Sequence, residues 1–209
     1  MKACTLIAAG LLLTAAATAH AQSIALEKTS CIPKEDNGVV RANTSGAVSA
    51  QTPRLYFRWK DHEDFYWVEM EAEPGGRFWA TPPKPEERNE QVEVYAALVD
   101  AIGKVVTRSE SQLVKVTKGC DVRLTEKERG VAENLTVGET SPKQEGKKVM
   151  AFLCDGVVTR VNSAGIRRSD GVCRACVIAW WQRAAAVAPS FALITPPFHP
   201  PEEPSPARP

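Results

Sequence analysis

Histidine is scarce in this chain, with three residues in 209. Two of them, His62 and His199, lie outside the N-terminal 21 residues, and they are far apart in the sequence. The sequence contains no recognisable serine–histidine–acid set, phosphate-binding glycine loop or array of metal ligands. It therefore predicts no catalytic residue, no metal site and no cofactor.

An excess of charge of one sign is also missing. The chain has 26 Lys and Arg residues against 25 Asp and Glu residues. Loss of an N-terminal segment that contains Lys2 would leave a formal charge of zero. No basic stripe interrupts this balance, so we expect neither nucleic acid nor an anionic membrane surface as a partner.

The one long apolar run lies at the N-terminus, MKACTLIAAGLLLTAAATAHAQS. Lys2 precedes an apolar stretch over about residues 6–18, and Ala19-His20-Ala21 has the small-x-small pattern of a cleavage site. The apolar stretch is short for a membrane span. We therefore predict a signal peptide over residues 1–21, cleaved after Ala21, and a secreted or periplasmic protein. Cys4 precedes the apolar stretch, so it is expected to be lost with the signal rather than lipidated.

Five cysteines follow the predicted signal: Cys31, Cys120, Cys154, Cys173 and Cys176. In an oxidising compartment disulfides are the default fate of such cysteines. Because five is an odd number, one thiol stays free or pairs with another chain.

Short segments with alternating apolar and polar residues dominate residues 22–120. In QVEVYAALVD (91–100) the apolar side chains Val92, Val94, Ala96 and Leu98 fall on one face. Turn residues such as EPGG (73–76) separate segments of this kind. The other predicted strands cover 23–28, 38–42, 54–59, 64–70, 77–81, 105–109 and 112–116. This pattern predicts an all-β domain, an antiparallel sandwich.

The run RLYFRW…FYWVEM…GGRFWATPP…VEVYAALVDAIGKVVTRS resembles immunoglobulin-like or fibronectin-III-like domains of secreted bacterial proteins. Those domains commonly carry a tyrosine on the penultimate strand and then a D-x-x-G hairpin, as Tyr95 and residues 100–103 do here. The resemblance covers about residues 53–116, concerns the fold and implies no activity. In such a sandwich the ends of the first and last strands lie at one pole, so the resemblance implies a Cys31–Cys120 disulfide that closes the fold.

Nine aromatic residues lie between Tyr56 and Tyr95. Several are consecutive, so a strand must direct them to both of its faces. The outward members could form a binding patch for a protein or a cell-envelope glycan. The candidates for this patch are Tyr56, Tyr66, Trp67 and Trp79. The alternative is that loops or the following module cover these rings.

Residues 121–188 are predicted to form a small cysteine-containing module. In LTEKERGVAENL (124–135) Thr125 is placed to cap a short helix, with Glu128 reaching back to it. Three predicted strands follow at 149–154, 157–161 and 166–168, with tight turns between them. They would make a β-meander, which is marginally stable without a disulfide or the preceding sandwich.

The pair Cys173 and Cys176 has the C-x-x-C spacing of redox centres. A thioredoxin-like site needs a surrounding parallel α/β unit, which this sequence does not show. Covalent haem would need histidine at position 177, where valine stands, and a zinc site needs a fourth ligand beside Cys154, Cys173 and Cys176. A disulfide from Cys154 to Cys173 or Cys176 explains the pattern with the fewest assumptions. Thiol–disulfide exchange and an intermolecular bridge remain alternatives.

The C-terminal region adds two features. Trp180 and Trp181 are expected to pack against the first module, with peripheral membrane contact as the alternative. Residues 189–209 contain eight prolines and are expected to be an extended or disordered spacer or docking segment. The sequence therefore predicts a secreted or periplasmic, non-enzymatic binding or structural protein that acts through a sandwich surface. The enzymatic alternative is a thiol–disulfide oxidoreductase that uses Cys173 and Cys176.

Overall fold

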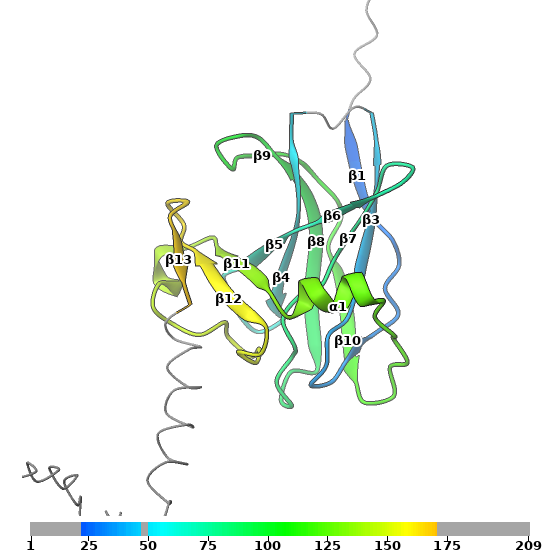
Figure 1. The fold of residues 1–209 in the computed structure, drawn as a ribbon, viewed down its shortest axis with the longest axis vertical. Helices are drawn as coiled ribbons and strands as arrows, with labels where there is room; N and C mark the ends of the chain where they lie inside the picture. Colours follow the sequence, from blue (N-terminus) through cyan, green and yellow to red (C-terminus); the bar gives the residue numbers. More distant parts are fainter. Residues whose placement is uncertain (1–21, 47–49, 171–209) are drawn as a thin grey trace, which may run out of the picture. The chain divides into compact units, whose positions relative to one another are not determined.

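Strands separated by tight turns make up most of the structure, a computed structural model that describes residues 22–46 and 50–170 (Figure 1). The strands are β1 (Ser23–Leu26), β2 (Ile32–Pro33), β3 (Val40–Ser45), β4 (Thr52–Trp59), β5 (Tyr66–Glu69), β6 (Glu71–Glu73), β7 (Arg77–Ala80), β8 (Gln91–Val99), β9 (Val105–Arg108), β10 (Gln112–Thr117), β11 (Leu135–Glu139), β12 (Val157–Val161) and β13 (Arg167–Ser169). The helical elements are α1 (Glu126–Ala132) and the 3-10 turn η1 (Pro142–Gln144). The predicted all-β class with one short helix is confirmed.

The strands form two sheets. The small sheet has the order β1-β3-β7-β6, and the large sheet has the order β13-β12-β11-β5-β4-β8-β10-β2, with β9 also pairing with β8. Most neighbours are antiparallel, whereas β2–β10 and β11–β12 are parallel. Side chains from both sheets meet in one hydrophobic core, which is the arrangement of a β-sandwich.

The core follows directly from the alternation of residues along the strands. Val92, Val94, Ala96 and Leu98 of β8 are fully buried in it, on the face that the sequence predicted. The small sheet contributes residues such as Val40 of β3 to the same core. Full burial of a valine or leucine side chain contributes about 1.5–3 kcal/mol, so these positions dominate the stability of the sandwich.

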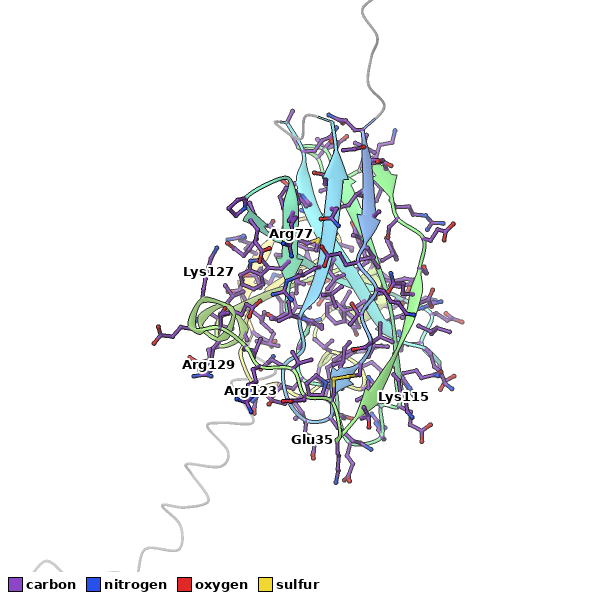
Figure 2. All side chains as sticks on the ribbon, turned by 90° about the vertical axis from the view of Figure 1, so that its right-hand side faces the viewer. Glu35, Arg77, Lys115, Arg123, Lys127 and Arg129 are labelled. Carbon is purple, nitrogen blue, oxygen red and sulfur yellow. A yellow bond between two sulfur atoms is a disulfide. The ribbon has the colours of Figure 1, made fainter. Side chains whose placement is uncertain are left out.

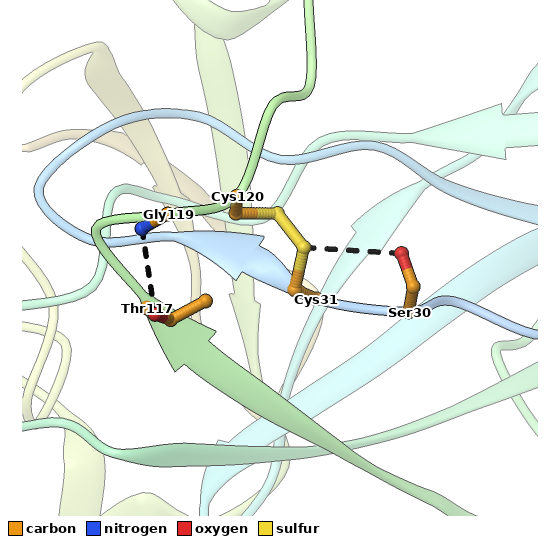
Figure 3. The surroundings of a disulfide bond; sticks show 5 residues. All are labelled: Ser30, Cys31, Thr117, Gly119 and Cys120. Atoms are coloured by element: carbon orange, nitrogen blue, oxygen red, sulfur yellow. Dashed lines mark hydrogen bonds between the residues drawn. A yellow bond between two sulfur atoms is a disulfide. The ribbon is translucent and has the colours of Figure 1, made fainter.

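The predicted Cys31–Cys120 disulfide is present (Figure 3). Cys31 directly precedes β2, and Cys120 follows β10, the parallel neighbour of β2. The bond therefore fastens the end of the last sandwich strand to an early segment 89 positions away, across a Cα–Cα distance of 5.9 Å. In the chain-entropy treatment a closure of this length stabilises the fold by at most about 4–5 kcal/mol.

Helix α1 begins as predicted. The Thr125 side chain accepts a hydrogen bond from the Glu128 backbone, and the Glu128 carboxylate accepts one from the Thr125 backbone at 2.8 Å. The same carboxylate pairs with Arg41 of β3 at 2.5 Å. Glu128 therefore both caps the helix and fixes it to the small sheet.

The segment after residue 120 continues the large sheet on the side of β5 (Figure 1). Strand β11 pairs antiparallel with β5, β12 pairs with β11, and β13 pairs with β12. Leu135, Val137 and Val157 from these strands join the core of the sandwich. The sequence-based division at residue 120 thus separates segments that share one sheet and one core.

One predicted strand of the meander is wrong. Residues 149–154 form turns with a single isolated bridge, between Phe152 and Pro85. The backbone of Ala151 has φ 65°, which an extended strand does not allow. Val149, Ala151 and Phe152 are all buried, so an apolar run that resembles a strand is instead a turn that fills the core. Strand β12 lies between β11 and β13 in the sheet, and β11 is a strand that the sequence did not predict.

Several predictions fall outside the described residues. They concern the signal segment 1–21, the pair Cys173 and Cys176, Trp180 and Trp181, and the proline-rich residues 189–209. Among the described residues, no helix is long and apolar enough to cross a membrane.

Candidate binding groove on the outer sheet face

A row of aligned residues crosses the outer face of the large sheet, which is the face turned away from the core. The strand registers place Tyr95 of β8 opposite Tyr56 of β4, Tyr56 opposite Trp67 of β5, and Trp67 opposite Gly138 of β11. Gly138 in turn lies opposite Val161 of β12. Side chains in such a row are direct neighbours, so five strands share one continuous outer floor.

The rings of this floor are tightly packed. Tyr56 and Tyr95 are stacked, with ring centroids 4.7 Å apart and planes 3° from parallel. The Trp67 ring extends over the backbone of Gly138, where any side chain would collide with it. On top of Trp67, 3.7 Å from the ring centroid, lies the guanidinium of Arg54. A cation in this position is attracted by the π-electrons of the ring.

Two hairpins flank the floor. The turn between β8 and β9 stands on one side, and the turn between β12 and β13 stands on the other. Together they enclose a groove of about 760 Å³. Ile102, which lines the groove, is 87% exposed, and Ile166, which lies between the lining residues Gly165 and Arg167, is 51% exposed. A concave surface bordered by exposed apolar side chains is a candidate site for binding another molecule.

The groove contains cations and carboxylates. Arg54 lies 3.9 Å from Glu69, and Glu139 forms a 2.7 Å ion pair with the buried Arg160. Burial raises the pKa of Glu139, while Arg160 opposes this shift. The Oε2 atom of Glu139 is buried and has no hydrogen-bond partner among the described residues.

The tyrosines of the floor are neutral at physiological pH. Burial, and then the neighbouring Tyr56, raises the pKa of Tyr95 to about 12. Burial also raises the pKa of Tyr56, although Arg54 opposes the change. The floor therefore presents uncharged phenols next to a fixed guanidinium.

The face around α1 is less suited to binding. Figure 2 shows Lys127 and Arg129 on the helix and Arg77 on β7. Two of these cations already face carboxylates of the protein, at 3.5 Å for Arg77–Glu27 and 3.7 Å for Lys127–Glu71. Internal pairing of this kind leaves less charge for a partner.

The predicted aromatic patch requires a correction. Tyr56, Tyr66, Trp67 and Trp79 are all buried, so none of them is an exposed surface ring. Tyr66 belongs to the core, where its hydroxyl accepts a hydrogen bond from the Met150 backbone. The remaining three rings are covered: Trp79 lies 5.5 Å from Lys127 of α1, and Tyr56 and Trp67 form the groove floor beneath Arg54. Of the four predicted residues, Tyr56 and Trp67 are therefore brought together, on the floor of the groove.

Three of the five cysteines that follow the predicted signal lie in the described part of the chain. Cys31 and Cys120 are bonded to each other, and Cys154 also takes part in a disulfide. Because no other cysteine is described, the partner of Cys154 lies outside the described residues. The bridge from Cys154 to Cys173 or Cys176 stays a prediction. In the described part of the chain, no group of three or more His, Cys, Asp or Glu residues is placed to hold a metal ion.

Sequence reasoning missed several groove residues, namely Arg54, Gly138, Val161 and Arg167, and it did not assign Tyr95 to the site. A signal existed for Arg54 and Tyr95, since they alternate with core residues and so share the outer face with Tyr56. No sequence signal pointed to Gly138, because it meets Trp67 only through the pairing of β11 with β5.

No protein-family model matches this chain, and comparison with curated proteins finds no significant match. The fold and the groove therefore carry the functional argument.

Proposed function

We propose that this chain is an exported, non-enzymatic binding protein in which an immunoglobulin-like sandwich presents the outer-face groove to a segment of a protein partner. The observation that carries the proposal is the groove itself, with its aromatic floor and its two apolar rims.

The strand order supports the immunoglobulin-like assignment. If β1, β3, β4, β5, β6, β7, β8 and β10 take the letters A, B, C, C′, D, E, F and G, the small sheet has the order ABED. The large sheet then contains GFCC′, as in variable-type immunoglobulin domains. One feature departs from antibody domains: the disulfide joins the start of β2 to the end of β10 instead of linking strands B and F.

The chemistry of the groove favours a protein partner over a glycan. A glycan would stack on exposed aromatic faces, but Trp67 is covered by Arg54, and Tyr56 is buried against Tyr95. The exposed groups are instead the aliphatic side chains Ile102 and Ile166. Aliphatic anchors between polar neighbours match the composition of protein–protein contacts.

The disulfides support both export and a non-enzymatic role. Cys31–Cys120 is a bond that persists in an oxidising compartment. Cys154 is bonded as well, and we propose that its partner is Cys173 or Cys176. Such a bond would occupy one cysteine of the C-x-x-C pair, which a thiol–disulfide oxidoreductase needs free.

The test uses a peptide library displayed on phage, selected against the wild-type protein. Two variants remove the apolar rims, Ile102→Asp and Ile166→Asp. The matched control is Leu113→Asp on β10, because Leu113 is also strongly exposed, at 62%, but belongs to neither of the two hairpins that flank the groove. We expect enriched peptides that bind the control like the wild type and lose about tenfold or more in affinity with either rim variant.

Four outcomes decide against the proposal. Peptides that bind all variants equally would place binding elsewhere, and a library without enrichment would mean that the groove takes no peptide. Binding on a glycan array that is lost in the rim variants would reassign the groove to a glycan. Glutathione exchange at Cys173 and Cys176 in the native protein would favour the enzymatic alternative.

A further inference from the structure

We propose that the groove selects an extended segment of a partner protein in which an aliphatic residue and an Asp or Glu residue are adjacent. The aliphatic side chain meets Ile102 on the β8–β9 hairpin, and the carboxylate meets Arg167 on β13. This inference rests on the proposed function and names the chemistry of the partner. It follows from three properties of the groove: the contrast between its rims, its unbalanced charge and the shared geometry of its two hairpins.

The side chains that line the groove differ between its two rims, although each rim carries an exposed isoleucine. The lining residues from the β8–β9 hairpin are all uncharged: Ala101, Ile102, Gly103 and Val105. The lining residues from the β12–β13 hairpin are mainly polar and include a cation: Asn162, Ser163, Ala164, Gly165 and Arg167. Burial of apolar surface is favourable, so the exposed Ile102 favours an aliphatic group beside it. The opposite rim favours a polar or negatively charged group.

Arg167 supplies the charge that the groove does not balance. Glu139 is paired with Arg160 at 2.7 Å, and Glu69 has Arg54 as its ion-pair partner at 3.9 Å, so each of these pairs is neutral. Arg167 is exposed, and no ion pair between described residues includes it. An arginine binds a carboxylate through paired N–H donors, so a carboxylate complements this rim.

The two arginines of β13 have different surroundings. Arg167 lies opposite Val161, a residue of the groove floor, and lines the groove. Successive side chains of a strand point to opposite faces, and Arg168 pairs with Glu145 at 2.6 Å. Arg168 is therefore a matched position at which a positive charge can be removed from the same strand on its other face.

Both hairpins are held by the same turn. The Oδ1 atom of Asp100 accepts hydrogen bonds from the backbone N–H groups two and four positions later, at 3.1 and 2.8 Å. The Oδ1 atom of Asn162 accepts the equivalent bonds at 3.2 and 2.9 Å. A glycine three positions later completes each turn, Gly103 with φ 81° and Gly165 with φ 80°. Each rim is thus fixed by its own side-chain bonds, which lowers the ordering cost of binding a partner.

The fixed rims determine the spacing of the residues that the groove selects. In an extended chain, successive side chains point to opposite sides. A segment that lies between the two hairpins therefore directs one side chain towards Ile102 and the next towards Arg167. We expect the aliphatic and acidic residues to be one position apart, or separated by another odd number of positions.

The experiment selects a random-peptide phage library on the full chain and measures the affinity of a synthetic copy of the most enriched peptide. The enriched peptides should contain Asp or Glu at an odd spacing from Val, Ile or Leu. Arg167→Gln should weaken binding about fivefold or more, because the carboxylate loses its paired donors. The matched variant Arg168→Gln should change the affinity less than about twofold, since its charge lies on the other face and in a surface ion pair.

Two double-mutant cycles locate the contacts. Replacement of the acidic residue of the peptide by its amide should weaken binding to the wild type about fivefold, with almost no further loss on Arg167→Gln. Replacement of the aliphatic residue by alanine should be non-additive with Ile102→Ala and additive with Arg167→Gln. Lys104→Gln removes an exposed charge from the β8–β9 hairpin and should show no coupling to the acidic residue.

Enriched peptides without an acidic residue, or with one that does not couple to Arg167, would overturn the inference. A carboxylate that couples to Lys104 would do the same, because it would reverse the orientation of the segment. If such peptides still lose affinity with Ile102→Asp, the proposed function stands and only the partner chemistry is wrong. If the library yields no peptide, the proposed function fails together with the inference.

Discussion

The indole ring of Trp67 lies against the backbone of Gly138 on the neighbouring strand. A β-carbon at residue 138 would overlap the indole ring at its Cε2, Cζ2 and Nε1 atoms. This contact lets the ring extend across β11 and join the sandwich face to the strands that follow it. Residue 138 is therefore glycine because the ring needs the space, and not because the chain turns there.

Gly138→Ala should destabilise the protein by about 1–3 kcal/mol, because the ring must move away from an outer floor that is already closely packed. The free energy of unfolding from urea titration measures this effect. Gly130→Ala is the matched control: Gly130 lies in α1, and an added β-carbon there meets nothing within 4 Å. Since alanine is the better helix former, the control should be stabilised by up to about 1 kcal/mol. Equal effects of the two variants would contradict this account of Trp67.

Removal of the Cys31–Cys120 bond should lower the free energy of unfolding by about 2–5 kcal/mol, because the unfolded chain then gains the entropy of an open loop. The double variant Cys31→Ala with Cys120→Ala tests this in urea titration. The bond also anchors β2 beside β10, so hydrogen exchange should rise at Ile32 and Val116. An unchanged unfolding midpoint would show that the parallel β2–β10 pairing holds this end of the sandwich without the bond.

The sandwich could be predicted because the patterns that specify its strands lie within short stretches of the sequence. Strands such as β8 alternate apolar and polar residues in sequence, and burial follows that alternation. The capping box of α1 is local as well, since Thr125 and Glu128 are three residues apart. The Cys31–Cys120 bond was accessible through the resemblance, which fixed the relation between the first and last strands.

The groove was not predictable, because it depends on which strands become neighbours. Burial of Tyr56 and Trp67 requires β11 and the hairpin after β12, and nothing in the sequence specifies that β11 pairs with β5. The short strand β11 lacks the long alternation of β8, and its Gly138 suggests a loop. Residues 149–154 fail in the other direction: their apolar run has the pattern of a strand, but it forms a turn with buried side chains.

Cys154 should be found linked to Cys173 or Cys176 in the purified protein. The structure shows Cys154 in a disulfide, and Cys31 and Cys120 are used by each other. Blocking free thiols under denaturing conditions, followed by digestion without reductant and mass spectrometry, identifies the linked peptides. We expect one blocked cysteine in the mature chain, which should also begin after Ala21. A Cys173–Cys176 link with a free Cys154 would contradict both the bridge and the non-enzymatic assignment.

Glu139 and Glu86 should have opposite effects on the pH dependence of stability. Burial raises the pKa of Glu139 in the folded protein above its usual value of 4.5, against the opposing effect of Arg160. Burial alone would also raise the pKa of Glu86, but Lys148 and Arg88 outweigh it and lower the pKa. A folded state that binds a proton more tightly than the unfolded chain becomes less stable as pH rises, and the reverse holds for a folded state that binds it less tightly.

We take the free energy of unfolding of the wild type minus that of the variant. For Glu139→Gln this difference should fall as pH rises from 4.5 through the raised pKa of Glu139. For Glu86→Gln the same difference should grow as pH rises through the lowered pKa of Glu86 towards 4.5. Urea titrations from about pH 3 to about pH 7 measure both slopes. The loss of the Arg160 ion pair shifts the whole curve for Glu139→Gln, so the sign of the slope is the informative quantity. Slopes of the same sign would mean that Arg160 outweighs burial at Glu139, and that the carboxylate in the groove wall is stabilised in its charged form.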